Sequence, residues 1–150
     1  MKLKDNLNYK KILSLLLKQD GSPFSNAKGI AVGVFCGCFP FFGFQTLLGL
    51  CLARVVRGNL FLAAIGTWIS NPFTYIPLYF FNYKVGSYFI KTSTDIIFDK
   101  NSIRHQFWEQ GSVFSLRLIL GSGLVGLLLA TIFGCIVFLL YKRKIKKRRI

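Results

Sequence analysis

The sequence predicts an all-α fold: a helical integral membrane protein with two hydrophobic segments broken by proline and glycine, one of them a candidate re-entrant segment, and one long C-terminal transmembrane helix. Hydrophobic residues make up 53% of the chain and charged residues 17%, a composition too apolar for a soluble domain of this size. All five acidic residues lie outside the long apolar runs, and seven of the 20 basic residues lie in the tail at 142–149. Charges sorted by segment in this way are typical of membrane proteins.

The order of these features divides the chain into five parts. They are an N-terminal amphipathic surface helix (1–21), a broken-helix membrane module (22–90), a polar and interfacial connector (91–117), a transmembrane helix (118–141) and a basic cytoplasmic tail (142–150).

The first part has leucines and one isoleucine spaced among lysines over residues 7–19. This pattern predicts a short helix on the membrane surface, with its lysines toward anionic headgroups, or a helix packed on the core of the protein itself. We expect no cleaved signal peptide, because the apolar stretch Ile12–Leu17 is short and no small-residue cleavage site follows it.

The first hydrophobic segment, Gly29–Ala53, is uncharged and follows a predicted helix start at Ser22-Pro23. A straight helix of this length would measure about 37 Å and would cross a bilayer core. Proline removes a backbone N–H and glycine permits a reversal, so we expect Pro40 and Gly43 to interrupt the segment near its middle. Neither half would span the membrane alone.

A second segment has the same design. Leu60–Ile69 is apolar, Ser70-Asn71-Pro72 breaks it, and Phe73–Phe81 resumes it. Few neighbouring positions match between the two segments, so the architecture recurs without a demonstrated sequence repeat.

Leu118–Tyr141 is the clearest transmembrane segment, with 24 uncharged residues that would form about 36 Å of helix. Upstream, residues near 103–114 favour an interfacial helix. Small residues recur every four positions along the transmembrane segment, which lets another helix approach closely. They are Ser122, Gly126, Ala130 and Gly134. The helix on this face would belong to the same chain, to a second copy in a homo-oligomer, or to a membrane enzyme partner.

The distribution of Lys and Arg predicts that the C-terminal tail is cytoplasmic, with the basic N-terminus on the same side. Because both ends lie on the same side, the chain must cross the membrane an even number of times. We therefore favour Gly29–Ala53 as a re-entrant hairpin that returns Arg54 and Arg57 to the cytoplasm. Leu60–Tyr83 would then cross outward and Leu118–Tyr141 would cross back. The alternative has three full crossings and an external N-terminus.

Two linked motifs carry a resemblance to a known family. The first motif is Ser22-Pro23 followed by Ile30-Ala31-x-Gly33-x-Phe35-x-Gly37-x-x-Pro40-x-x-Gly43-x-Gln45-Thr46. The second is Arg57-x-Asn59 followed by Gly66-Thr67-Trp68-x-x-Asn71-Pro72-x-Thr74-x-x-Pro77-x-Tyr79. Together they resemble, over about residues 22–90, the bacterial membrane family known as domain of unknown function 2062.

The resemblance implies a small multi-pass protein of the bacterial inner membrane, in a family without an assigned activity. Some relatives in that family are joined to glycosyltransferase domains. This chain looks like the stand-alone membrane module, so any coupling to glycan or lipid chemistry would need a separate partner.

Paired helix breaks within a membrane point to a binding site, because lipid cannot satisfy the backbone groups that the breaks expose. Helix N-termini after Gly43 and at Pro72 would suit an anion. The alternative is that the polar residues only satisfy the backbone at two structural kinks. The candidate ligand-binding residues are Pro40, Gly43, Gln45, Thr46, Arg54, Arg57, Asn71, Pro72, Thr74, Tyr75 and Tyr79.

Two functions fit these features. The first is to bind or move an anionic small molecule, lipid-linked or phosphate-bearing, at the paired breaks. The second is a non-catalytic scaffold or accessory partner for a cell-envelope lipid or glycan enzyme. We expect no enzyme, because no catalytic constellation lies at membrane depth.

We also expect no metal and no cofactor, because the four cysteines lie in apolar segments away from the single histidine, His105. The basic tail directly follows a transmembrane segment. Anionic membrane lipids are therefore its expected partners, and no nucleic acid is expected.

Overall fold

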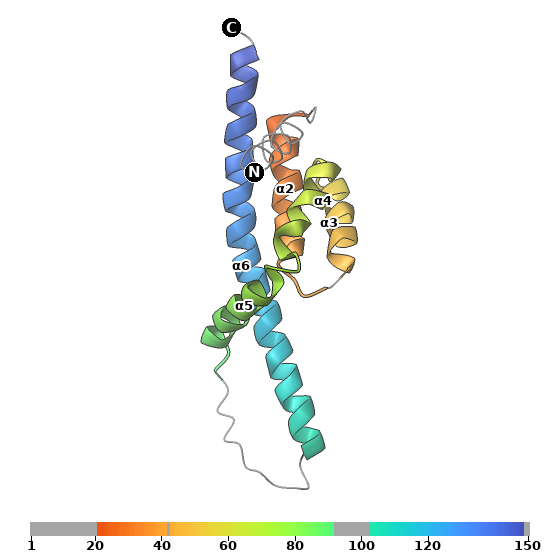
Figure 1. Cartoon of the computed structure of the whole chain (residues 1–150), viewed down its shortest axis with the longest axis vertical. Helices are drawn as coiled ribbons and strands as arrows, with labels where there is room; N and C mark the ends of the chain where they lie inside the picture. Colours follow the sequence, from red (N-terminus) through yellow and green to blue (C-terminus); the bar gives the residue numbers. More distant parts are fainter. Residues whose placement is uncertain (1–20, 42, 92–102, 149–150) are drawn as a thin grey trace, which may run out of the picture.

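The computed structural model describes residues 21–41, 43–91 and 103–148, and these residues form helices joined by short turns (Figure 1). The elements are α2 (Pro23–Gly37), α3 (Phe44–Val55), α4 (Leu60–Gly66), the 3-10 helix η1 (Thr67–Ser70), α5 (Tyr75–Phe89) and α6 (Ile103–Arg148). The all-α prediction is confirmed over the described residues, which contain no strand. The expected surface helix at residues 7–19 lies outside them.

Helix α2 begins where the sequence predicts a start. The Ser22 hydroxyl accepts a hydrogen bond from the backbone N–H of Ser25 (3.1 Å), and Pro23 occupies the first turn. The helix ends at Gly37, and α3 begins after Gly43, which has a φ of 82°. This is a backbone conformation that glycine adopts without steric cost. The first predicted break is therefore present.

Helices α2, α3 and α4 run alternately away from and toward one end of the molecule. After α3, Gly58 N–H donates to the Ala53 carbonyl oxygen (2.7 Å), and Asn59 N–H donates to the Ser25 carbonyl oxygen (2.9 Å). The side-chain oxygen of Asn59 then caps α4 by accepting from Leu62 N–H (3.1 Å). The start of α2 and the α3–α4 turn therefore lie side by side.

The last turns of α6 reach the same end of the molecule. The Phe24 ring on α2 meets the Phe138 ring on α6 with 6.4 Å between centroids. Positive charge is carried in this region by Arg54, Arg57 and the segment Lys142–Lys144. We call this region the basic end, defined as residues 23–28, 54–59 and 138–148.

Helix α6 is continuous over 46 residues, which corresponds to about 69 Å. It contains both the helix expected near 103–114 and the predicted transmembrane segment at 118–141, with no interruption between them. Among the described residues, Gly111–Ile145 is the helix long and apolar enough to cross a membrane. Figure 1 shows α2 along the C-terminal half of α6 and α5 crossing α6 near its middle.

The small-residue face of α6 packs against α2 of the same chain. Ser122, Gly126, Ala130 and Gly134 are all buried. A Cβ atom added at Gly126 would lie 3.2 Å from the Phe35 ring, and one at Gly134 would lie 3.2 Å from the Ala31 Cβ. The close approach that the sequence predicts is thus used within the chain.

Helix α5 crosses α6 at two glycines. A Cβ atom at Gly86 would overlap the Arg117 carbonyl oxygen, and one at Gly121 would overlap the Asn82 carbonyl oxygen. The buried Asn82 side chain donates to the Cys38 carbonyl oxygen (2.9 Å) and to the Ser122 hydroxyl (3.0 Å). This one amide joins the end of α2 to α5 and α6.

The buried apolar core is small, and many large apolar side chains face outward. Ile30, Val34 and Leu62 form the core with Tyr141. Exposed apolar side chains lie along α3, α5 and α6, and they include Leu47, Leu52, Ile76, Phe80, Leu127, Leu128, Ile136 and Leu139. Such extensive apolar surface marks contact with lipid or with other proteins rather than with water alone.

Candidate functional site

A cavity of about 210 Å³ with several polar residues in its lining lies between the two helix breaks. It is lined by Gln45, Thr46, Thr67, Trp68, Ser70, Asn71 and Pro72. The first two belong to the first turn of α3, and the others belong to η1 and the turn that follows it. Four residues that the sequence singles out, two from each break, therefore line one cavity. We call it the break pocket.

The Gln45 side chain is hydrogen-bonded to the protein through its oxygen. Its Oε1 atom accepts a hydrogen bond from the Ser70 hydroxyl at 3.1 Å. Its Nε2 atom has no hydrogen-bond partner among the residues that the structure describes. With Oε1 bound to Ser70, the two N–H groups of Gln45 are left for a ligand or water.

Asn71 has the same division of roles. Its Oδ1 atom accepts from the backbone N–H groups of Phe73 (2.9 Å) and Thr74 (3.1 Å). Its Nδ2 atom has no partner within the described part of the chain. The two backbone donors establish which side-chain atom is the oxygen, so a second pair of N–H groups remains available in the break pocket.

The capping by Asn71 corrects one expectation about the second break. A helix N-terminus was expected at Pro72, with free backbone N–H groups for an anion. The helix α5 instead begins at Tyr75, and the Asn71 oxygen already takes the N–H groups of Phe73 and Thr74. Pro77 lies in the first turn of α5, where a missing N–H costs no helical hydrogen bond.

Two threonines close the inner side of the break pocket. The Thr46 and Thr67 hydroxyl oxygens are 3.1 Å apart, and the Thr67 hydroxyl donates to the Ala64 carbonyl oxygen at 2.7 Å. A hydroxyl has one hydrogen, so Thr46 is the donor to Thr67. Both hydroxyl hydrogens are thereby used, and the free donors of the pocket come from the amides.

The remaining candidates near the breaks have structural partners. The Thr74 hydroxyl donates to the Ile69 carbonyl oxygen at 2.6 Å, and the Tyr79 hydroxyl donates to the Phe39 carbonyl oxygen at 3.1 Å. The Tyr75 ring packs against the Tyr79 ring with 6.2 Å between centroids. Pro40 and Gly43 belong to the turn between α2 and α3. These five residues shape the breaks without lining the pocket.

Arg54 and Arg57 do not belong to the break pocket. Gln45 lies in the first turn of α3 and Arg54 in its last turn, so they are about 14 Å apart along the helix. Arg57 follows at the basic end, where its carbonyl oxygen accepts from the Ser25 hydroxyl at 3.2 Å. The structure thus separates the two arginines from the polar residues with which the sequence groups them.

Thr67, Trp68 and Ser70 line the break pocket although the sequence reasoning did not select them as site residues. Thr67 and Ser70 are three residues apart just before the proline break, and this spacing places two hydroxyls on one side of a 3-10 turn. That spacing was the available signal. Trp68 is 77% exposed, so its ring also forms part of the outer surface.

The chemistry of the break pocket is that of a neutral hydrogen-bond donor site. Its lining has no charged side chain. In the described parts of the chain, no three His, Cys, Asp or Glu residues come together as a metal site. Gln45 and Thr46 lie at the start of α3, where the helix dipole adds partial positive charge. The arrangement favours a ligand group that accepts hydrogen bonds.

Comparisons with known proteins support a family assignment. No match was found among the curated proteins or among the solved structures. A scan against protein families matches residues 8–149, which extends the resemblance of residues 22–90 to nearly the whole chain. The chain belongs to the bacterial family described as "Uncharacterized protein conserved in bacteria (DUF2062)".

Proposed function

We propose that this chain is a multi-pass protein of the bacterial inner membrane, with its C-terminus in the cytoplasm. The candidate span Gly111–Ile145 and the exposed apolar side chains of α3, α5 and α6 support membrane residence. Basic residues gather at one end of the molecule, as expected for a cytoplasmic face. On this view Arg117 and Lys142 bracket the hydrocarbon-embedded part of α6.

The helix lengths support a re-entrant α2–α3 hairpin in this proposal. Helix α2 has 15 residues and measures about 22 Å, less than a hydrocarbon core of about 30 Å. Helix α3 then returns to the basic end. Helix α4 and η1 lead away from it again, and α6 leads back. The break pocket would then lie inside the membrane, away from the cytoplasmic face.

We further propose that the break pocket binds the polar group of an anionic small molecule, lipid-linked or phosphate-bearing, for recognition or movement across the membrane. One observation carries this proposal: Gln45 and Asn71 line one pocket, their side-chain oxygens accept hydrogen bonds from the protein, and their N–H groups have no partner among the described residues. Phosphate and carboxylate oxygens accept several hydrogen bonds at once, which matches four clustered donors.

A scaffold role has less support in the structure. The small-residue face expected to bind another protein already packs against α2. A partner enzyme would therefore need another surface, such as the exposed apolar side of α3. No polar feature of that side selects a protein over lipid among the described residues.

The proposed ligand can be tested with two substitutions that keep the structural role of each amide. Asn71→Asp retains an oxygen to cap Phe73 and Thr74, and the two backbone N–H groups keep the new carboxylate ionised. Gln45→Glu retains an oxygen for Ser70. Each change replaces two donors by an acceptor and would repel an anion. Ser115→Asp is the control, because it adds the same charge at an exposed position of α6.

The measurement is native mass spectrometry of the gently purified full-length protein, with identification of any co-purifying molecule. We expect a phosphate- or carboxylate-bearing molecule on the unmodified protein and on Ser115→Asp. We expect its loss from Asn71→Asp and Gln45→Glu at an unchanged unfolding temperature. Retention by both pocket variants, or its absence from the unmodified protein, would reject the proposal.

A further inference from the structure

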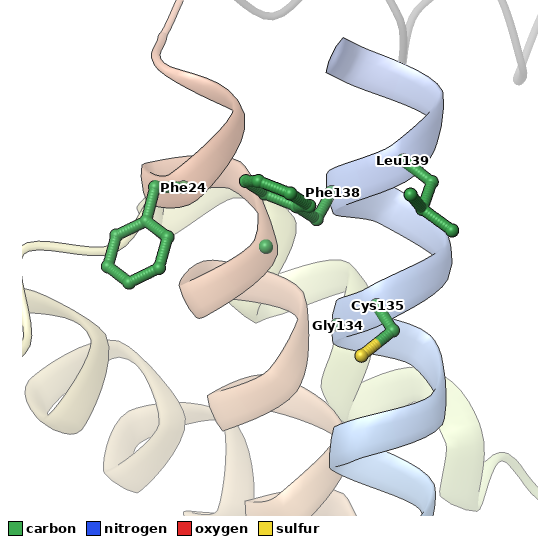
Figure 2. A pocket seen from close by; sticks show the side chains of 6 residues that line it. Phe24, Gly134, Cys135, Phe138 and Leu139 are labelled. Carbon is green, nitrogen blue, oxygen red and sulfur yellow. The ribbon is translucent and has the colours of Figure 1, made fainter. Parts of the chain in front are cut away.

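A second cavity lies far from the break pocket, in a groove between α2 and α6 at the basic end. It has a volume of about 360 Å³ and is lined by Phe24, Ala27, Gly134, Cys135, Phe138 and Leu139. Figure 2 shows Phe138 reaching from α6 toward α2, with Cys135 and Leu139 on the α6 side. The lining is apolar, so the groove suits a hydrocarbon chain.

The groove exists because α6 has no side chain at Gly134. At this position α6 packs against Ala27 and Ala31 of α2, which are also small. Four residues further along α6, the Phe138 ring meets the Phe24 ring edge-on. The groove lies beside these two rings and is open to the outside.

Two lysines place positive charge over the Phe24 and Phe138 rings, which form one end of the groove. The Lys28 ammonium lies 4.7 Å from the centre of the Phe24 ring, and the Lys142 ammonium lies 6.0 Å from the centre of the Phe138 ring. Both distances are typical of cation–π contacts. Each ring of the Phe24–Phe138 pair thus has one cation over it.

Neither ammonium is saturated by the protein. Lys28 donates one hydrogen bond, to the Val56 carbonyl oxygen at 3.0 Å. An ammonium has three donor hydrogens, so two remain for a ligand. The Lys142 side chain is exposed and makes no ion pair or hydrogen bond within the described residues.

We propose that this groove binds one anionic phospholipid, with an acyl chain along Phe24, Cys135 and Leu139 and with the headgroup at the end of the groove formed by the Phe24 and Phe138 rings, each of which carries a lysine. An apolar slot with cations at one end matches the order of groups in such a lipid, in which the phosphate lies above the acyl chains. Charge complementarity distinguishes this occupant from a zwitterionic lipid. The inference rests on the proposed membrane residence and is independent of the ligand in the break pocket.

The test compares an anionic and a zwitterionic phospholipid that have identical acyl chains. Full-length protein in detergent is mixed with equal amounts of phosphatidylglycerol and phosphatidylcholine, and bound lipid is counted by native mass spectrometry. We expect one phosphatidylglycerol to persist at collision energies that remove phosphatidylcholine. A basic residue near acidic lipid contributes about 5-fold in binding, so Lys28→Gln with Lys142→Gln should reduce the preference up to about 30-fold.

A second variant tests the acyl-chain slot directly. Cys135 is exposed and lines the groove, so Cys135→Trp fills the slot without entering the α2–α6 contact. We expect loss of the retained lipid. Cys51→Trp is its control, because Cys51 is an exposed cysteine on α3. Lys84→Gln is the control for charge, because Lys84 also lies over a ring, that of Phe80, but on α5.

Each result decides the proposal. Unchanged lipid retention in Cys135→Trp would overturn it, and so would an unchanged lipid preference in the double lysine variant. Equal losses in the control variants would overturn it as well. The break-pocket variants Asn71→Asp and Gln45→Glu should keep the groove lipid. Either binding proposal can therefore be rejected without the other. A full-length protein that remains soluble without detergent would reject the membrane residence that underlies both.

Discussion

The Asn82 side chain donates to the Ser122 hydroxyl at 3.0 Å, at the point where α5 crosses α6. The same amide nitrogen donates to the Cys38 carbonyl oxygen, one residue beyond the end of α2. A break in a helix exposes carbonyl groups, and here one of them is satisfied by a residue 44 positions away. The crossing of α5 and α6 is therefore linked to the first helix break.

We expect Asn82→Ala to destabilise the fold more than Ser122→Ala. The first change leaves the buried Cys38 carbonyl without its donor and should cost about 1–3 kcal/mol. The second removes one interhelical hydrogen bond, which in membrane proteins contributes about 0.6 kcal/mol on average. Unfolding of the two variants in detergent by increasing SDS concentration measures the difference. Equal losses would mean that the Cys38 contact contributes nothing.

Gly121→Ala should disrupt the crossing of α5 and α6. The added methyl group would overlap the Asn82 carbonyl oxygen, which belongs to the backbone and cannot rotate away. Gly111→Ala is the matched control on the same helix, because a Cβ atom there meets nothing within 4 Å. It should be neutral or stabilise by up to about 1 kcal/mol through helix propensity. The thermal unfolding temperature should fall in Gly121→Ala and should stay the same or rise in Gly111→Ala. An unchanged unfolding temperature in Gly121→Ala would contradict the crossing geometry.

Asn71 allows the capping role to be separated from the donor role. Asn71→Ala removes the acceptor for Phe73 and Thr74 and should cost about 0.5–2 kcal/mol. Asn71→Asp keeps the acceptor and should stay close to the unmodified protein in stability. Unfolding temperatures in detergent compare the two. If both variants were equally destabilised, the amide nitrogen would have a structural partner and the donor argument for the break pocket would weaken.

Arg57 has a φ of 55°, a left-handed conformation that is costly for residues other than glycine. Gly58 N–H donates to Ala53, and Arg57 N–H donates to Arg54, so the turn is a Schellman motif with arginine at the position that usually holds glycine. Arg57→Gly should therefore stabilise the isolated protein by up to about 1 kcal/mol. Arg57→Val should destabilise it. A loss of stability in Arg57→Gly would show that the guanidinium group contributes to the fold.

The proposed topology predicts that Arg57 and Lys84 are reached from opposite sides of the membrane. Arg57→Cys and Lys84→Cys are made separately, in a background without the four native cysteines. A membrane-impermeant thiol reagent should label the first in inside-out vesicles and the second in right-side-out cells. Unfolding temperature checks that the cysteine-free background is intact. Labelling of both positions from the cytoplasmic side would contradict the arrangement.

Local signals predicted the helix boundaries that local interactions control. Ser22 and Pro23 start α2, and Gly43 starts α3, because a cap and a positive φ depend on neighbouring residues alone. The sequence predicts a helix start at Pro72, but α5 begins three residues later, at Tyr75. The side chains of Asn71 and Thr74 form a hydrogen-bonded turn before the helix begins.

Long-range relationships could not be predicted from the sequence. Arg54 follows Gln45 closely in the chain, but the length of α3 places them at opposite ends of a helix. Asn82 gave no local signal, because its partners lie 44 and 40 residues away. The spacing of small residues on α6 predicted a close helix contact, yet the identity of α2 as the partner depends on the folded chain.

The contact between α2 and α6 has a consequence for how the protein is made. The face of α2 formed by Ala27, Ala31 and Phe35 meets α6, which is synthesised after the other helices that the structure describes. Until α6 has been made, this face of α2 lacks its partner in the fold. The α2–α6 contact can therefore form only after α6 has been synthesised, and a chaperone would have its opportunity to hold α2 in that interval.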